Sequence, residues 1–354
     1  MKGACLTLNS TPQSRPGDQA DAAAGAVLLL AKPRGFCAGV VRAVQVVELA
    51  LEAHGAPVYV LHEIIHNQRV LADLRERGAI FVEQLDEVPA QACVIFSAHG
   101  VARSVERAAR QRGLQVIDAT CPLVAKVHLE VMRHARAGRD LVMVGHAGHP
   151  EVVGTLGRFD VSRGGSAHLV ETMADVHALK VRDPLCVAVV TQTTLSVEDT
   201  RRVLAALRER FPAIVEPRRD DICYATQSRQ NGVRDLLPQA DLILVVGARN
   251  SSNANRLCEV AQDGGCDAHL VQDADEIDPR WLRPGIVIGI TAGASTPAVL
   301  VDDVVERLRG WGAGAVTEME GEDETVSFRL PVSLLRPNAL RETRKTTDEE
   351  HQPL

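Results

Sequence analysis

Aromatic residues make up only 3% of this 354-residue chain, and several features that would define a class of protein are absent as well. The net charge is −7 and no basic stripe occurs, which argues against a nucleic-acid partner. No apolar run approaches the roughly 18 residues of a membrane span, so we expect no membrane insertion. No Gly-x-Gly-x-x-Gly or Walker pattern follows a predicted strand, and we therefore predict no nucleotide site.

The eight cysteines form no Cys-x-x-Cys pair, and the N-terminus lacks the apolar segment of a secretory signal. A large chain of this kind is typical of the cytoplasm, where disulfide frameworks are rare. We therefore expect a cytoplasmic protein without a disulfide framework. Structural or neutral roles are assigned to Cys5, Cys93, Cys186, Cys258 and Cys266.

Short β-branched apolar segments alternate with helical patterns along the chain, which indicates an α/β fold. The other three cysteines each lie where such a segment ends and a helix begins. Cys121 stands in the stretch Asp-Ala-Thr-Cys-Pro, between a predicted strand at 114–117 and a predicted helix at 123–137. Cys37 likewise follows a strand at 27–31, and Cys223 follows one at 213–215.

The order of elements recurs after each of these cysteines, and each unit has two polar loops at strand ends. The distance to the first loop is 29 residues from Cys37 to His66, 28 from Cys121 to His149 and 29 from Cys223 to Ser252. The distances to the second loop are 62, 72 and 72 residues, ending at His99, Thr193 and Ser295. Three such units predict a pseudo-threefold assembly in which the strand at 27–31 closes the third unit.

This repeat sets the predicted domain boundaries. We expect a disordered leader at 1–25 and a disordered tail at 338–354, because both ends are polar. Between them we predict α/β domains at 38–121, at 122–219 and at 220–310 with 26–37, followed by a C-terminal crossover segment at 311–337.

Three cysteines near helix N-termini suit a metal, because helix dipoles and free N–H groups favour thiolates. Two metal sites fit a set of three thiolates. One is zinc with a histidine as the fourth ligand, and the other is a cuboidal iron–sulfur cluster with one iron that lacks a protein ligand. The alternative without a metal is that the cysteines only cap the strand ends.

Hydrogen-bond donors gather in the loops that follow the strands. Because ligands bind at the carboxyl ends of parallel strands, and helix N-termini attract anions, these loops suit phosphate or diphosphate. Glu151 lies on the same loop as His149, where a carboxyl shielded from water can donate a proton. The competing interpretation is a glutamate that complements the dipole of the helix beginning at Pro150. The candidate donors are His66, His99, His149, Thr193, Ser251, Ser252, Asn253 and Ser295.

Nine short motifs, in order over roughly 27–335, resemble those of the 4-hydroxy-3-methylbut-2-enyl diphosphate reductase family. They are GFCAGV at 35–40, HEIIHN at 62–67, SAHGV at 97–101, DATCP at 118–122, GHAGHPE at 145–151, TQTTLS at 191–196, DICYAT at 221–226, SSN at 251–253 and TAGAS at 291–295. The resemblance implies a trefoil of three α/β domains around a 4Fe–4S cluster. It also implies the two-electron reductive removal of an allylic hydroxyl as water, giving isopentenyl and dimethylallyl diphosphates.

The resemblance further implies a role for each candidate residue. Cys37, Cys121 and Cys223 would hold the cluster, whose fourth iron binds the substrate hydroxyl; a 3Fe–4S form would follow oxidation. Glu151 would donate a proton, with Thr193 and His149 positioning the hydroxyl or relaying protons. The diphosphate would be bound by His66, His99, Ser251, Ser252, Asn253 and Ser295, with His149 nearby.

Two other classes of protein share part of this pattern. A hydrolase or dehydratase would use the metal only as a Lewis acid. A non-catalytic phosphometabolite-binding protein would need the anion donors but not Glu151 and Thr193. Because no flavin or nicotinamide motif is present, we expect electrons from an external one-electron donor such as a ferredoxin or flavodoxin.

Overall fold

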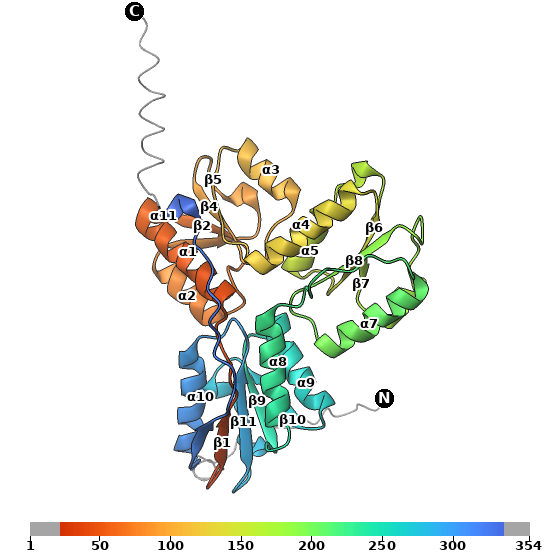
Figure 1. Cartoon of the computed structure of the whole chain (residues 1–354). Helices are drawn as coiled ribbons and strands as arrows, with labels where there is room; N and C mark the ends of the chain where they lie inside the picture. Colours follow the sequence, from red (N-terminus) through yellow and green to blue (C-terminus); the bar gives the residue numbers. More distant parts are fainter. Residues whose placement is uncertain (1–21, 336–354) are drawn as a thin grey trace, which may run out of the picture.

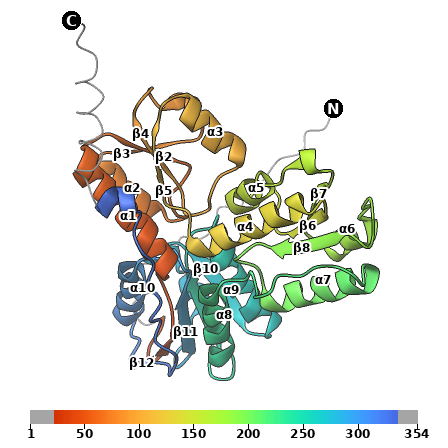
Figure 2. The same cartoon turned by 45° about the horizontal axis from the view of Figure 1, so that its top comes forward.

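The protein consists of three α/β domains around a common centre, as a computed structural model describes for residues 22–335 (Figure 1). Each domain has one sheet, and every pair of neighbouring strands is parallel. A second view shows the same three lobes from another side (Figure 2). The predicted α/β fold with three related domains is confirmed.

The first domain follows Cys37 and holds a four-stranded sheet in the order β3-β2-β4-β5. Its elements are α1 (Ala38–His54), β2 (Val58–Leu61), α2 (Gln68–Glu76), β3 (Ala79–Val82), the 3-10 helix η1 (Leu85–Glu87), β4 (Cys93–Phe96), α3 (Arg103–Gln111) and β5 (Gln115–Asp118). All four residues of β4 are buried, as expected for a central strand covered on both faces.

The second domain follows Cys121 and holds a three-stranded sheet in the order β7-β6-β8. Its elements are α4 (Pro122–Arg136), β6 (Asp140–Val144), α5 (Pro150–Leu156), the 3-10 helix η2 (Val161–Arg163), β7 (Ala167–Val170), α6 (Met173–Ala178), β8 (Val187–Thr191) and α7 (Val197–Arg210). Ser196 caps α7 by accepting a hydrogen bond from the Asp199 N–H (3.2 Å), which fixes the start of this helix.

The third domain follows Cys223 and holds a five-stranded sheet in the order β10-β9-β11-β1-β12. Its elements are α8 (Tyr224–Leu236), β9 (Leu242–Val246), α9 (Ser252–Asp263), β10 (Asp267–Val271), the 3-10 helices η3 (Ala274–Glu276) and η4 (Pro279–Trp281), β11 (Val287–Ala292), α10 (Ala298–Gly310) and β12 (Val316–Glu318).

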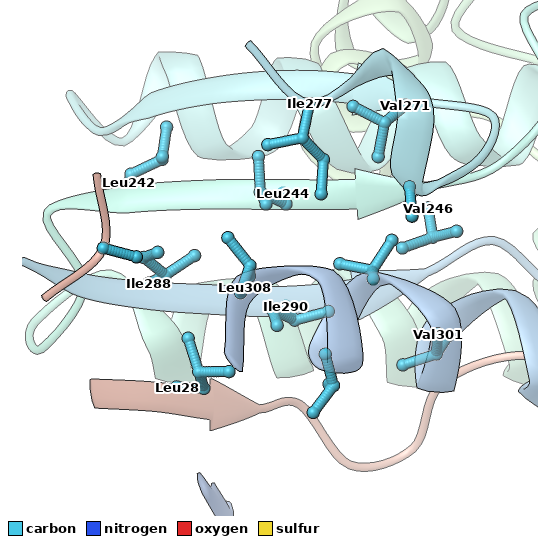
Figure 3. Close-up of a cluster of buried hydrophobic side chains, with 14 of the residues drawn as sticks. Leu28, Leu242, Leu244, Val246, Val271, Ile277, Ile288, Ile290, Val301 and Leu308 are labelled. Carbon is cyan, nitrogen blue, oxygen red and sulfur yellow. The ribbon is translucent and has the colours of Figure 1, made fainter. Parts of the chain in front are cut away.

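The strand β1 (Val27–Leu30) also belongs to this third sheet, where it lies between β11 and β12. Leu28 is fully buried there and packs with Leu244, Ile288 and Ile290 in one apolar cluster (Figure 3). The strand that leads to Cys37 therefore comes from the third domain, while the helix that follows Cys37 belongs to the first. This is the position predicted for the strand at 27–31, which was expected to close the third unit.

The C-terminal segment leaves β12 and runs back to the first domain, where it ends in α11 (Val332–Leu335) beside α1 (Figure 1). Leu334 is buried in the core of that domain, and the Arg42 side chain donates to the Arg329 carbonyl (2.8 Å). This path is the one predicted for a crossover segment.

Several predicted boundaries are wrong. The segment 213–215 is not a strand, because only Val215 forms a bridge, to Ala188, between the flanking residues Pro212 and Pro217. The predicted leader is too long: Ala23 is fully buried and its N–H donates to the Trp311 carbonyl (2.9 Å). Residues 1–21 of the predicted leader and the tail at 338–354 lie outside the described residues. The short strands β10 and β12 were not predicted.

Each helix formed by residues 22–335 is too short or too polar to cross a membrane.

Candidate functional site

Three helices begin at the centre of the molecule, and each begins at one of the predicted cysteine ligands. Cys37, Cys121 and Cys223 are the N-cap residues of α1, α4 and α8. Each cysteine N–H also donates to a carbonyl of a neighbouring strand-end loop, at 3.0–3.2 Å, and the acceptors are Ala294, Ala98 and Thr193 respectively. The three junctions are therefore equivalent in space as well as in sequence.

The cysteine side chains face one cavity. A β-carbon added to Gly39 would lie 2.8 Å from the Cys121 sulfur and 3.7 Å from the Cys37 sulfur. Glycine at this position therefore keeps free the space between two of the thiols. All three cysteines line the same cavity, together with residues from all three domains.

The arrangement of the thiols bears on the two metal sites considered above. A single zinc ion needs three or four donors that converge at about 2.0–2.3 Å on one point. No group of three such side chains within residues 22–335 is arranged in this way. In an iron–sulfur cluster each thiolate binds a different iron, so the sulfurs stand further apart. The three separate thiols around an open space fit a cluster.

Burial governs the protonation of two of these thiols. It raises the pKa of Cys121 to about 12 and that of Cys223 to about 11. For Cys121 and Cys223 the metal-free protein therefore departs from the expectation that the helix N-termini favour thiolates, because desolvation outweighs the hydrogen bonds from the helix start. Metal binding would have to release these protons.

Three histidines from two domains form a cluster beside the cysteines. The rings of His66 and His99 stack with their centroids 4.4 Å apart, and His149 meets them edge-on at 5.6 and 5.7 Å. Burial lowers the pKa of His149 to about 4 and holds that of His99 well below its ordinary value, with a further contribution from the neighbouring rings. An anion bound among the rings would favour their charged forms.

Two residues that the sequence did not single out hold His66 in place. Glu63 Oε2 accepts a hydrogen bond from His66 Nδ1 (2.8 Å), which leaves Nε2 buried and without a protein partner. Asn250, from the third domain, donates to the same carboxylate oxygen (2.9 Å). The bond from His66 lowers the pKa of Glu63, so this carboxylate is charged at neutral pH. Glu63 therefore orients His66 and links two domains.

Glu151 is the predicted proton donor, and it lies buried next to Thr193. The Thr193 N–H donates to Oε1 (2.7 Å) and the Thr193 hydroxyl donates to Oε2 (2.9 Å). Burial raises the pKa of Glu151 to about 7, although both bonds from Thr193 act in the opposite direction. At neutral pH the carboxyl group thus populates both the protonated and the ionised form, as a general acid requires.

His149 packs against the start of the helix that carries Glu151. Its Nδ1 accepts a hydrogen bond from the Glu151 N–H (3.1 Å), so the neutral ring carries its proton on Nε2. The dipole interpretation of Glu151 holds only in part: the residue lies in the first turn of α5, but its carboxyl group is bound to Thr193.

The predicted anion donors of the third domain lie at the same cavity. Ser251 caps α9, Ser295 Oγ donates to the His66 carbonyl (3.0 Å), and the Thr194 hydroxyl donates to Ser252 Oγ (3.0 Å). Asn253 is 4% exposed, and neither of its side-chain polar atoms has a protein partner. Buried polar groups usually have partners, so an orphaned amide facing a cavity indicates that a polar ligand binds there.

The sequence did not indicate the supporting role of one buried glutamine, Gln192. Gln192 Oε1 accepts from the His146 N–H (3.0 Å), and its amide donates to the Thr194 hydroxyl (3.0 Å). It fixes the loop after β6 to the loop after β8. No sequence pattern beyond its place between two predicted strand-end residues could have identified this contact.

The structure brings together every residue that the sequence predicted for the site. All twelve of them line the same cavity, together with other residues: Cys37, His66, His99, Cys121, His149, Glu151, Thr193, Cys223, Ser251, Ser252, Asn253 and Ser295. A histidine cluster, three thiols and a buried acid in one cavity are a set of side chains with which an enzyme could hold a metal and bind an anionic substrate.

Comparison with known proteins identifies the family. Residues 28–309 match the model of the LytB protein family, and the chain belongs to this family. A relative from Xanthomonas axonopodis pv. citri, named 4-hydroxy-3-methylbut-2-enyl diphosphate reductase, is 59% identical over 87% of this chain and 98% of its own length. A relative of the same name from Xanthomonas campestris pv. campestris is 58% identical over the same shares.

Two solved structures are similar throughout. The E-1-hydroxy-2-methyl-but-2-enyl-4-diphosphate reductase from Plasmodium falciparum has a TM-score of 0.84 and 35% identity, covering 90% of this chain and 99% of the other. An (E)-4-hydroxy-3-methyl-but-2-enyl diphosphate reductase, described as the terminal enzyme of the non-mevalonate pathway, has a TM-score of 0.57 and 34% identity, covering 80% and 99%.

Proposed function

We propose that this chain is a 4-hydroxy-3-methylbut-2-enyl diphosphate reductase, an oxidoreductase that catalyses the last step of the non-mevalonate isoprenoid pathway. Relatives that match it over nearly their whole length carry this name. The observation that carries the proposal is the single cavity where three thiols, three histidines and the Glu151–Thr193 pair meet.

In this proposal Cys37, Cys121 and Cys223 hold a 4Fe–4S cluster in which one iron lacks a protein ligand, and a 3Fe–4S form arises on oxidation. The space beside Gly39 and the equivalent positions of the three cysteines support this assignment. When bound, the cluster supplies electrons and a Lewis-acidic iron for the allylic hydroxyl.

The diphosphate binds to the donors opposite the thiols. The buried Nε2 of His66 and the unpartnered amide of Asn253 support this role, because each needs a partner that the protein does not supply. Side chains from separate domains then fix the substrate on both sides, which orients its hydroxyl as well as binding it. The proposed diphosphate ligands are His66, His99, Ser251, Ser252, Asn253 and Ser295, with His149 at the edge.

Glu151 supplies a proton to the departing hydroxyl, and Thr193 and His149 position that hydroxyl or relay protons. The reaction breaks one C–O bond, consumes two electrons and two protons, forms one C–H bond and releases water. The carbon that gains hydrogen decides between isopentenyl and dimethylallyl diphosphate. A carboxyl group with a pKa of about 7 suits this step, because it holds a proton at neutral pH and also gives it up.

The electrons come from an external one-electron donor of the ferredoxin or flavodoxin class, since the sequence has no flavin or nicotinamide motif. We propose that the protein acts in the cytoplasm, in keeping with the seven free cysteines of residues 22–335.

The test is anaerobic turnover of hydroxymethylbutenyl diphosphate with a reduced low-potential donor, alongside measurement of iron, sulfide and zinc. We expect about four iron and four sulfide per chain, a brown chromophore and both isoprenoid diphosphates as products. Stoichiometric zinc without a visible chromophore, or an iron–sulfur protein that leaves the substrate unchanged, would refute the proposal.

A further inference from the structure

Each of the three helices that begin at a cysteine carries a cation five or six residues further on. These are Arg42 on α1, Lys126 on α4 and Arg229 on α8. The contacts of each cation extend beyond the cysteine at which its own helix begins. Each reaches across to the segment that leads into another of the three cysteines.

Arg42 binds the segment before Cys121. Its Nη1 donates to the carbonyls of Ala119 (3.0 Å) and Thr120 (3.1 Å), and its Nη2 lies 3.5 Å from the Asp118 carbonyl. Within residues 22–335 no carboxylate forms an ion pair with Arg42. Its described side-chain partners are therefore backbone carbonyls alone.

Lys126 binds the segment before Cys223. Its Nζ donates to the carbonyls of Arg219 (2.8 Å) and Asp220 (3.0 Å). It also pairs with the fully buried Asp221 side chain (3.2 Å), which in turn accepts from the Thr191 N–H (3.0 Å).

Arg229 binds the segment before Cys37 and so completes a cycle. Its guanidinium donates to the Gly35 carbonyl from Nε (3.0 Å) and from Nη2 (2.7 Å), and Nη2 lies 3.4 Å from the Phe36 carbonyl. The side chain is fully buried and pairs with Glu324 of the C-terminal segment (2.7 and 2.9 Å).

The three contacts run in one direction around the threefold axis, from the helix after Cys37 to the Cys121 junction, then to the Cys223 junction and back to Cys37. A long cation with several donors suits this position, because it can satisfy two or more backbone carbonyls of one loop at once. Hydrogen bonds from charged donors are also stronger than those between neutral groups. The cysteine junctions are thus joined to one another without any metal.

We propose that Arg42, Lys126 and Arg229 are positioning residues that set the distances between the three cysteines before the cluster binds, and that slow its loss of iron. This inference rests on the proposed function, in which these cysteines hold one cluster. Outer residues that orient metal ligands typically contribute about 10- to 100-fold to metal affinity. The two arginines also contact the C-terminal segment, which gives that segment a role in keeping the site assembled.

The test compares Arg42→Met with Arg107→Met, a control in which an exposed arginine of the same domain, on α3, is replaced. Urea unfolding of each metal-free protein shows whether it folds. Separate folded samples are reconstituted with iron and sulfide, and the rate of iron loss to a ferrous chelator is measured under anaerobic conditions. We expect Arg42→Met to lose iron about 10-fold faster than the wild type and to show a changed electron paramagnetic resonance spectrum after reduction. Arg107→Met should match the wild type in both measurements.

Iron loss at the wild-type rate with an unchanged spectrum would overturn the inference. If Arg42→Met does not fold, Arg42→Lys supplies the test: one ammonium group cannot serve all the carbonyls that the guanidinium fork serves, so faster iron loss is again expected, and a wild-type rate again refutes it. A wild-type protein that assembles no cluster would instead refute the proposed function.

Discussion

Replacing Glu151 by glutamine should have opposite effects on activity and on stability. Glutamine keeps the shape of the side chain, and its amide can still pair with the N–H and hydroxyl of Thr193. It cannot donate the proton that the reaction needs. Loss of a general acid typically lowers the rate by about 10²- to 10⁴-fold, so Glu151→Gln should bind substrate normally and turn it over at most at about 1% of the wild-type rate.

The effect on stability depends on pH. The folded-state pKa of Glu151 is about 7, above its ordinary value of 4.5. A raised carboxyl pKa means that folding disfavours the ionised form, so the stability of the wild type is full below about pH 4.5 and is lost as the pH rises through 7. The difference corresponds to about 3 kcal/mol at high pH, from roughly 1.4 kcal/mol for each pKa unit. Glutamine does not ionise and avoids this penalty.

The assay is urea unfolding of metal-free wild type and Glu151→Gln at pH 5 and pH 8, together with anaerobic turnover of the reconstituted proteins. The variant should gain stability relative to the wild type at pH 8 and little at pH 5. An equal difference at both pH values would show that Glu151 does not titrate as we infer. Unchanged turnover would remove Glu151 as the proton donor.

Three further predictions concern the thiols and the histidine cluster. Cys121→Ser should fold but bind little iron, measured by visible absorbance and iron content after reconstitution; a normal cluster band would contradict ligation by this residue. Gly39→Ala should do the same without removing any ligand, because the new methyl group would lie 2.8 Å from the Cys121 sulfur, whereas full iron content would show that the site has room to adapt. Glu63→Gln should raise KM about 10-fold with a smaller change in kcat, because His66 loses the charged hydrogen-bond acceptor that orients its ring. A KM equal to that of the wild type would show that His66 is oriented without Glu63.

The threefold plan of the molecule could be predicted from the sequence because repetition is a local signal. The cysteines at 37, 121 and 223 each precede a helix, and their loops follow at nearly constant distances. The segment 213–215 has the apolar pattern of a strand, but prolines on either side limit it to one bridge. Strand β12 has only three residues, and the pairing of β10 with β9 and of β12 with β1 depends on contacts that only the folded chain provides.

The candidate site was predictable in its ligands and not in the residues that support them. The motifs around His66 and Glu151 carry the resemblance to a family, so these residues were found. The bond from Asn250 to Glu63 joins residues 187 positions apart, and that from Arg229 to Gly35 joins residues 194 apart. Nothing in a single sequence relates such distant positions. The pKa of Cys121 was misjudged for a similar reason, because burial depends on packing by several domains.

The place of β1 in the third sheet has a consequence for biosynthesis. Val27 pairs with Val287, so this strand leaves the ribosome roughly 260 residues before its partner. At about 5–20 residues per second, the apolar strand waits for some tens of seconds before β11 exists to cover it. During this time Cys37 is attached to an unpaired segment, although the first and second domains can already fold. Cys37, whose N–H donates to the Ala294 carbonyl, thus reaches its place in the folded protein only after β11 has been made, and in the proposed function the cluster would be inserted into a nearly complete chain.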